Sequence, residues 1–385
     1  MRSEIIATVI GVLLSYPILA GTVPAGNHRA APAPDCEAGV VCSGSLVAAG
    51  RGALFYNRVP TGIVKLDAQT GQPLWTFSPP KGWVASNLVT TRSLLFFAGN
   101  TAGPCGPIYA VDTESGQTKW SKDYSSCRLW SDGQRLYIQG ATGDGVRALD
   151  PMTGQQLWLA EDETPQFVLN LVVRNGRVYT NDRVLDAETG KTLFWWPKEA
   201  AISSLLAGDS LVYAAGRSGV VTAYGATAQQ KEWQSKLLAG ERIVIFATAS
   251  ELVYAVGYAG NSMKARDGIL QAFHANSGEP KWQYRIQSCC QDLDASPVGV
   301  GGSVLFLLKP LDAESGTELV ALDAATGKLL WSFQSTVTLQ GPPFPRRPNV
   351  YVVDAQGTLV ALEASTGRRV WAYKPFSNGD YGGGP

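Results

Sequence analysis

The fold of this chain is decided by residues 322–331, which read Leu-Asp-Ala-Ala-Thr-Gly-Lys-Leu-Leu-Trp. Their pattern, Asp-x-x-[Ser/Thr]-Gly-x-x-x-Trp, returns eight times along the sequence. The copies end at Trp75, Trp120, Trp158, Phe194, Trp233, Trp282, Trp331 and Trp371. The steps between these residues are 45, 38, 36, 39, 49, 49 and 40. A self-similar phrase that returns every 40 to 45 residues or so is typical of the four-stranded blades of a β-propeller.

The segments between the copies argue against helical repeats of similar period. They are short, β-branched and aromatic, as in residues 211–215 and 303–308, which favours strands. The sequence therefore predicts an all-β protein, an eight-bladed β-propeller of four-stranded antiparallel blades over residues 45–375. The predicted blades cover residues 45–78, 84–122, 128–160, 167–197, 202–236, 242–285, 293–334 and 346–375.

Each position of the repeat has a mechanical interpretation. The acidic residue ends a strand and is expected to accept hydrogen bonds from the amides of a turn, and the glycine supplies the positive φ of a tight hairpin. The Trp begins the outer strand, where its ring is expected to wedge between neighbouring blades. Two copies depart from this pattern. Copy five has Gly225 in the acid position and Gln229 in the glycine position, and copy six has His274 in the acid position.

Composition and the first residues indicate an exported chain. With 32 basic and 32 acidic residues among 385, the protein has no net charge to attract nucleic acid or an anionic membrane. Residues 1–25 read as a signal peptide that is cleaved after Ala20 or Ala25, and an uncleaved anchor is the alternative. Residues 26–44 form an Ala/Pro-rich leader, and residues 376–385 a Gly-rich tail. No further segment is long enough to span a membrane, and no lipobox precedes Cys36, so we expect a periplasmic or secreted monomer.

Six cysteines in an exported chain predict disulfides, although six allow fifteen pairings. Cys36 and Cys42 are close enough in sequence to pair locally. Cys105 and Cys127 fall in two kinds of connection that share one rim of a propeller, which makes their pairing geometrically sensible. The remaining two, Cys289 and Cys290, are adjacent in sequence.

Residues 319–331 and 357–371 resemble the PQQ-type β-propeller repeat of quinoprotein alcohol dehydrogenases and of the outer-membrane assembly protein BamB. The resemblance covers roughly residues 45–375, and eight matching copies make it specific for the fold. It implies an eight-bladed ring whose inner strands line a central channel. Because one fold serves many functions, the resemblance does not itself decide whether a cofactor binds.

The sharpest candidate for chemistry is the vicinal pair Cys289-Cys290 followed by Asp292. In quinoprotein alcohol dehydrogenases, which this segment resembles, such a disulfide lies over the quinone, and neighbouring cysteines form a strained bridge. The family's Asn-Arg segment is replaced here by residues 293–297, and its set of cation ligands has no counterpart. A rigid structural turn is therefore the favoured interpretation, and we assign no metal and no catalytic residue.

Uneven connections indicate where a partner binds. The link between second and third strands is long in blades two, six and seven, over residues 99–107, 257–268 and 309–317, and the cysteine connections share that rim. Lengthened loops on one face of a rigid scaffold commonly carry binding. The candidate contact residues, beside Cys289, Cys290 and Asp292, are Trp83, Arg128, Trp130, Arg346 and Arg347. The alternative for Trp83 and Trp130 is burial in blade junctions.

The sequence thus predicts an exported, non-catalytic binding or scaffolding propeller that resembles BamB, requires no cofactor, and engages an envelope or extracellular protein. Outer-membrane protein assembly is the expected setting, although the absent lipobox departs from the usual BamB pattern. One alternative is a compact alcohol or sugar dehydrogenase that uses PQQ with Ca²⁺. Another is a sensor or cell-surface propeller that binds a peptide or glycan.

Overall fold

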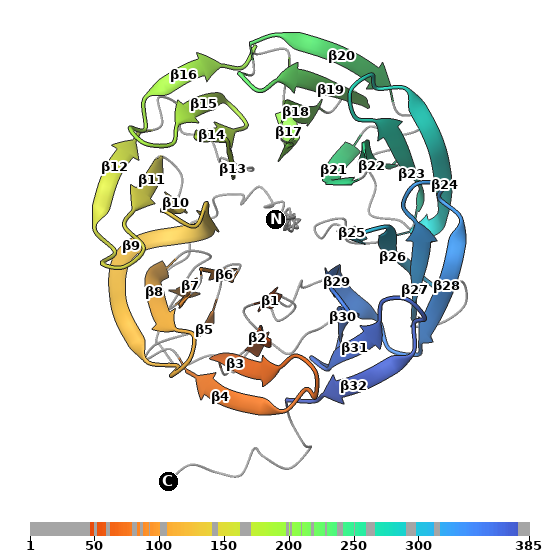
Figure 1. Cartoon of the computed structure of the whole chain (residues 1–385), viewed down its shortest axis with the longest axis horizontal. Coiled ribbons are helices and arrows are strands. Elements are labelled where there is room, and N and C mark those ends of the chain that lie inside the picture. The colour runs from red at the N-terminus through yellow and green to blue at the C-terminus, as the bar shows by residue number, and fades with distance from the viewer. Residues whose placement is uncertain are drawn as a thin grey trace, which may run out of the picture.

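The chain forms a closed ring of eight four-stranded antiparallel blades (Figure 1), which confirms the predicted fold class. The computed structural model describes residues 47–49, 52–58, 62–78, 83–84, 88–91, 93–100, 106–140, 145–161, 171–197, 200, 202–208, 210–216, 219–227, 229–236, 242–249, 251–258, 266–289, 298–311 and 316–375. Over these ranges, no helix has the length and apolar character that a membrane crossing demands.

The strands follow chain order from the channel outward in each blade. Blades one and two comprise β1 (Val47–Ala49), β2 (Ala53–Arg58), β3 (Gly62–Asp67), β4 (Pro73–Phe77), β5 (Trp83–Val84), β6 (Val89–Thr90), β7 (Leu94–Asn100) and β8 (Gly106–Asp112). β9 (Thr118–Ser131) is the outer strand of blade two and continues as the inner strand of blade three. Blades three and four continue with β10 (Leu136–Gly140), β11 (Val146–Leu149), β12 (Gln156–Ala160), β13 (Leu171–Arg174), β14 (Arg177–Thr180), β15 (Arg183–Asp186) and β16 (Thr192–Trp195).

The second half of the ring has the same order. Blades five and six comprise β17 (Ile202–Ala207), β18 (Leu211–Gly216), β19 (Val220–Gly225), β20 (Lys231–Lys236), β21 (Arg242–Ala249), β22 (Leu252–Tyr258), β23 (Arg266–His274) and β24 (Pro280–Cys289). Blades seven and eight comprise β25 (Val298–Gly301), β26 (Val304–Pro310), β27 (Thr317–Asp323), β28 (Leu329–Ser335), β29 (Leu339–Arg346), β30 (Asn349–Asp354), β31 (Leu359–Glu363) and β32 (Arg369–Tyr373).

The hydrophobic core lies in the seams between blades. One cluster joins Leu94 and Phe96 of blade two to Leu136 and Ile138 of blade three, and the other clusters likewise combine neighbouring blades. The second and third strands are buried on both faces, so they read as continuous apolar runs rather than alternating ones. Stability therefore depends on how well each blade fits the next.

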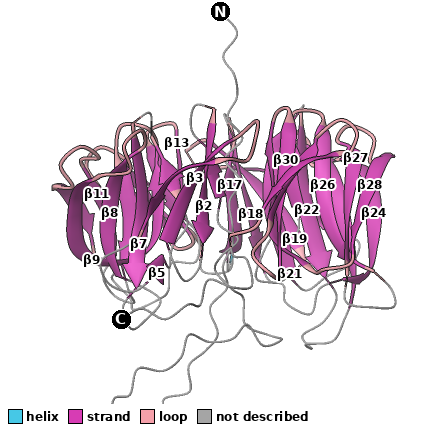
Figure 2. Ribbon diagram, turned by 90° about the horizontal axis from the view of Figure 1, so that it is seen from below, coloured by secondary structure: helices cyan, strands magenta, loops and turns pink. Residues whose placement is uncertain are grey.

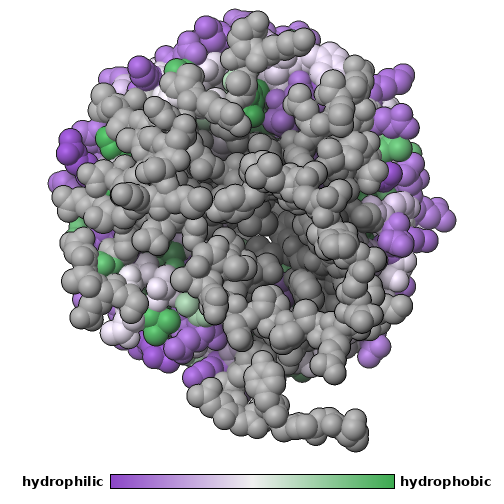
Figure 3. Space-filling view, turned by 180° about the vertical axis from the view of Figure 1, so that it is seen from behind, coloured by the Kyte–Doolittle hydropathy of each residue, from purple (hydrophilic) through white to green (hydrophobic). Residues whose placement is uncertain are grey.

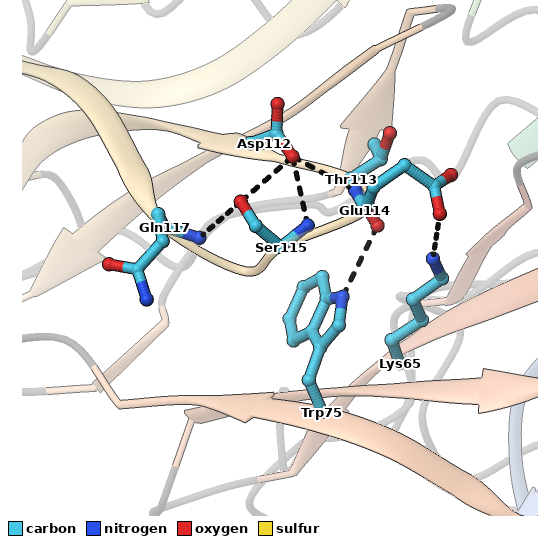
Figure 4. Close-up of polar contacts among 7 residues, drawn as sticks. All are labelled: Lys65, Trp75, Asp112, Thr113, Glu114, Ser115 and Gln117. Carbon is cyan, nitrogen blue, oxygen red and sulfur yellow. Dashed lines mark hydrogen bonds and ion pairs between the residues drawn. The ribbon is translucent and has the colours of Figure 1, made fainter.

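Figure 4 shows the repeat at the junction of blades one and two. The carboxylate of Asp112 accepts hydrogen bonds from the amides of Glu114 and Ser115, at 3.1 and 2.9 Å, and from the Ser115 hydroxyl at 2.9 Å. Trp75 of the preceding blade donates its indole Nε1–H to the carbonyl of Thr113 at 3.2 Å. The turn of one blade is thus the acceptor for the Trp of the blade before it.

The turn glycine has a second role beyond its positive φ. Gly116 lies against the ring of Trp75, and a Cβ built on this glycine would come within 3.0 Å of the indole. The corresponding distances in the other seams fall to 2.4 Å, at Gly278 beneath Trp233. We call this arrangement, an indole over a turn glycine with its N–H on a turn carbonyl, the seam latch. It occurs in seven seams, with acceptors Thr113, Pro151, Ala187, Ala275, Ala324, Ala364 and Ala68.

The seam between blades four and five lacks this latch. Its outer-strand aromatic is Phe194, which has no N–H to donate, and the receiving turn is the degraded fifth copy. The Tyr179 hydroxyl still donates to the carbonyl of Ala226 at 2.8 Å, as Tyr254 does to Ala324 in a latched seam. Trp196, only 6% exposed, lies in this seam and packs against Phe194 and Tyr224 with ring centroids 5.7 and 5.1 Å apart.

Blade eight begins earlier than predicted. Its inner strand, β29, starts at Leu339 instead of residue 346. Residues 342–345 include three prolines, and proline cannot donate to a ladder. The structure accommodates them on an edge strand with a register shift between Gln340 and Phe344. The practical consequence is that Arg346 ends this strand rather than starting it.

Candidate functional site

The ring has two rims with different connections. Each first strand turns into the second, and each third into the fourth, on one rim, which we call the turn rim; residues 68–72 and 347–348 are examples. On the other, the loop rim, second strands end and third strands begin, as at Asn100 and Gly106, and each outer strand leads to the next blade. Figure 2 shows the turn rim above and the loop rim below. The three long connections predicted to carry binding join strand ends on the loop rim.

The candidate cysteine cluster is only partly within the described residues. β24 ends on the loop rim at Cys289, whose backbone pairs with Arg266. The described residues do not include Cys290, Asp292, Cys36, Cys42 or Cys105, and of Cys289 and Cys127 they include the backbone alone. The vicinal pair and the other disulfides therefore stay predictions.

Two of the other candidate residues have backbones close to the loop rim. Trp83 pairs with Asn100, the last residue of β7, and Arg128 pairs with Gln139, near the end of β10. Both second strands end at that rim. The fold thus brings these two positions and the end of β24 to the same face of the ring.

Trp130 and Arg346 lie elsewhere. Trp130 pairs with Tyr137 near the start of β10, and its partly buried ring packs on the cluster between blades three and four. Arg346 is exposed and pairs with Asn349 across the β29–β30 hairpin, which places it on the turn rim. The expectation that Arg346 shares a surface with the cysteine connections was wrong, because it assumed that blade eight begins at this residue.

From the loop-rim side, the described side chains that can be seen lie mainly around the outer edge of the ring (Figure 3). Figure 3 views the molecule from this side; the described side chains around the edge are mainly hydrophilic, with scattered hydrophobic ones. No group of three or more His, Cys, Asp or Glu side chains that could hold a metal occurs in the described ranges. His274, in the turn of blade six, donates its backbone N–H to the carbonyl of Glu279 at 2.8 Å, the same turn bond that Asp112 makes to Gln117.

The shifted pKa values also belong to the architecture. Hydrogen bonds from the amide and hydroxyl of Ser115 lower the pKa of Asp112, and Thr70 and Thr189 do the same for Asp67 and Asp186. Burial raises the pKa of Tyr213 to about 12. These groups lie in turns and seams rather than converging on a cleft, so their shifts do not indicate catalysis.

Sequence reasoning missed an aromatic position on every second strand. It is occupied by Phe55, Phe96, Tyr137, Tyr179, Tyr213, Tyr254, Phe306 and Tyr351. In seven blades this ring packs on the Trp of its own blade, with centroids 5.7–6.0 Å apart. The tyrosines add a donor: the Tyr254 hydroxyl reaches the Ala324 carbonyl at 2.9 Å. The loops between second and third strands vary in length, so this aromatic residue does not lie at a constant distance in sequence from the Trp of its repeat. The register of the strands is the signal that reveals the shared position.

Lys65 is a second residue that the pattern did not reveal. It lies directly across from Trp75, at a position that is Ala in six other blades. Its buried stem carries the ammonium group to Glu114 of blade two at 3.1 Å (Figure 4). Glu114 is highly exposed, so this pair adds little energy. It joins the same two blades as the Trp75 latch.

Comparison with known proteins relates this chain to one protein family. The family model described as outer membrane protein assembly factor BamB matches residues 29–161, 142–307 and 266–378. The outer membrane protein assembly factor BamB of Burkholderia pseudomallei (strain K96243) is 28% identical over 295 residues, which are 71% of this chain and 72% of that protein.

Solved structures agree on the architecture. BamB from Moraxella catarrhalis superposes with a TM-score of 0.59 at 15% identity, over 82% of this chain and 94% of that one. The computationally designed Ika8 protein gives a TM-score of 0.64 at 16% identity, over 83% and 95%. At these identities the two structures bear on the fold alone. The matches of the family model span most of the sequence, and this chain belongs to the family described as outer membrane protein assembly factor BamB.

Proposed function

We propose that this protein is an exported, non-catalytic propeller that binds an envelope protein through its loop rim during outer-membrane protein assembly. The observation that carries the proposal is the family match along residues 29–378. The relative from Burkholderia pseudomallei bears the same assembly-factor description. The unlatched seam aside, each described blade junction is fixed by an indole hydrogen bond, so the ring is a stiff platform.

The arrangement of connections supports the loop rim as the binding face. Its links are long in blades two, six and seven, whereas the turn rim carries short hairpins such as Arg346–Asn349. A rigid scaffold with variable loops on one face is the usual arrangement for recognition. Export follows from the predicted signal peptide in residues 1–25, and periplasmic placement from the family.

The test is a pull-down from envelope extracts of a Gram-negative host that carries the tagged protein. We expect an outer-membrane assembly protein to be retained by the unaltered chain and lost when residues 259–265, which connect β22 to β23, are replaced by a two-residue Gly-Ser link. Gln134→Ala, in an exposed hairpin of the turn rim, is the matched control and should retain the partner. Equal retention by all three proteins, or by none, would count against the proposal.

A second measurement addresses the non-catalytic part of the proposal. The purified protein is incubated with PQQ and Ca²⁺, separated from free quinone, and assayed for dye reduction with alcohols and sugars. We expect no retained quinone absorbance and no substrate-dependent reduction. Stoichiometric PQQ that survives the separation would replace this proposal with the dehydrogenase alternative.

A further inference from the structure

Two positions of the repeat face each other across a seam, and the sizes of their residues differ from seam to seam. One lies on the third strand, three residues before the acid position, and the other on the preceding blade's outer strand, two residues after its latch aromatic. Tyr109 meets Phe77 with ring centroids 6.1 Å apart. In the next-but-one seam, the long side chain of Arg183 reaches the carbonyl of the small Ala160 at 3.3 Å. Large against small is one way in which the fold fills this space.

Blade four fills its face toward blade three with two large side chains. Arg183, on β15, pairs with Trp195, on β16, and the guanidinium lies 5.1 Å from the centre of the Trp195 ring. The matching pair in blade five is Thr222 and Gln234, which are also direct neighbours across β19 and β20. Both are smaller than their counterparts in blade four, and Trp196 of blade four packs on Tyr224 beside them.

A cavity of about 200 Å³ lies at this position, in the seam that also lacks the latch. We call it the seam cavity; it is lined by Pro197, Ala200, Ala214, Gly216, Val220, Thr222, Tyr224, Lys231 and Gln234. Its floor is buried and formed by Ala214 and Thr222, while Lys231 and Gln234 are exposed at its mouth. The Gln234 amide donates to the Thr222 hydroxyl at 3.4 Å. The base of the cavity therefore combines the methyl group of Ala214 with the hydroxyl of Thr222, and its mouth is polar.

The dimensions and the position of the cavity identify the class of ligand. Small-molecule pockets commonly measure roughly 300–1,000 Å³, so this volume suits a single large side chain instead. Lys231 and Gln234 belong to β20, the outermost strand of blade five (Figure 1), which pairs only with β19. An extended segment added to that open edge would direct alternate side chains toward the cavity.

The charges on β20 indicate which kind of extended segment would bind beside it. β20 carries exposed Lys231 and Lys236 near its ends and only one acidic residue, Glu232. We propose that the seam cavity receives one tyrosine side chain from an extended acidic segment of a protein partner, which adds to the edge of β20. The ring packs on Ala214, the hydroxyl meets Thr222 and Gln234, and a flanking carboxylate faces Lys231. The inference rests on the proposed function, since it names a second contact of the same partner-binding protein.

The test fills the cavity with residues that the fold already uses. Thr222→Arg and Gln234→Trp each introduce the blade-four residue of the matching position and add bulk to the cavity lining. The probe is a fluorescein-labelled octapeptide of Thr and Val with two Glu around a central Tyr. We expect saturable binding to the unaltered protein and at least about tenfold weaker binding to either variant, as for a buried anchor residue. The same peptide with Ala for Tyr should lose a similar factor.

Glu232→Gln is the control, because it removes the opposing charge from the same strand outside the cavity lining; it should bind the peptide at least as tightly. Two cavity variants guard against one that fails to fold. Unchanged affinity in a folded variant, or no binding by the unaltered protein, overturns the inference. The peptide readout is independent of the envelope pull-down: a partner retained through residues 259–265 but indifferent to Thr222→Arg leaves the proposed function standing and removes this site.

Discussion

Trp371 donates its indole N–H to the carbonyl of Ala68 at 3.2 Å, although 303 residues separate the two. Gly71 lies beneath the same ring, where an added Cβ would approach to 2.6 Å. The last blade therefore meets the first through the latch that joins its neighbours. Within the described residues, blades one and eight each keep four strands from a single stretch of chain, and the contacts that join them are between side chains and turns.

The turn glycine supplies a positive φ and also leaves room for the indole ring. A matched pair of substitutions separates these two roles. In Gly327→Ala, a methyl group at φ +70° would lie 2.6 Å from the Trp282 ring. Gly176 has nearly the same φ, +71°, with no atom within 4 Å. We expect Gly176→Ala to cost roughly 1 kcal/mol from backbone strain alone and Gly327→Ala roughly 3 kcal/mol because overpacking adds to it. Urea unfolding measures both; equal losses would show that the indole contact has no part.

The seam without a latch departs from the repeat at Phe194 and at Gln229. We expect the effect of restoring one position to depend on the other. Phe194→Trp alone should not stabilise the protein, because Gln229 occupies the position where every latched turn has glycine. Combined with Gln229→Gly, the same change should gain about 1 kcal/mol, near the worth of one hydrogen bond. A double-mutant cycle by chemical denaturation measures the coupling. Additive effects within error would contradict the interpretation.

Trp331→Phe, which removes a latch bond of 3.1 Å, should lower the free energy of unfolding by roughly 1–2 kcal/mol, as measured by chemical denaturation.

Acid should weaken the turns. Because the folded-state pKa of Asp112 lies below its ordinary value of 3.8, the stabilisation by its carboxylate is complete above that value. It is lost as the pH falls through the lowered pKa. Asp112→Asn keeps an acceptor oxygen but removes the charge. Its deficit in unfolding free energy should therefore be largest at neutral pH and shrink below pH 3.8, as measured by urea titrations across this range. A deficit that stays constant with pH would contradict the assignment.

The pairing of Cys105 with Cys127 is sharpened by strand register. Gly106 pairs with Ser126, so an antiparallel ladder continued by one residue would set the two cysteines opposite each other. We expect non-reducing peptide mapping of the exported protein to recover this cross-link, and Cys105→Ser to leave Cys127 reactive to alkylation. Recovery of Cys127 linked to any other cysteine would refute the pairing.

The repeat predicted the architecture because its Asp, Gly and Trp act locally, within a turn or on the adjoining blade. The eight copies therefore revealed blade number, turn positions and seam contacts. The position of Arg346 could not be predicted, because the prolines before it concealed an inner strand. The seam cavity was equally hidden: it depends on the sizes of Thr222 and Gln234 relative to residues far away in sequence, which only the register of β19 and β20 brings into comparison.

The central claim, that partner binding belongs to the loop rim, is tested most directly by site-specific photo-crosslinking in the envelope. A benzophenone amino acid is placed singly at exposed positions near each rim, such as Arg285 toward the loop rim and Gln134 or Arg346 on the turn rim. The account predicts adducts with an outer-membrane assembly protein from the loop-rim positions and none from the turn rim. Adducts confined to the turn rim, or none from either face, would contradict it.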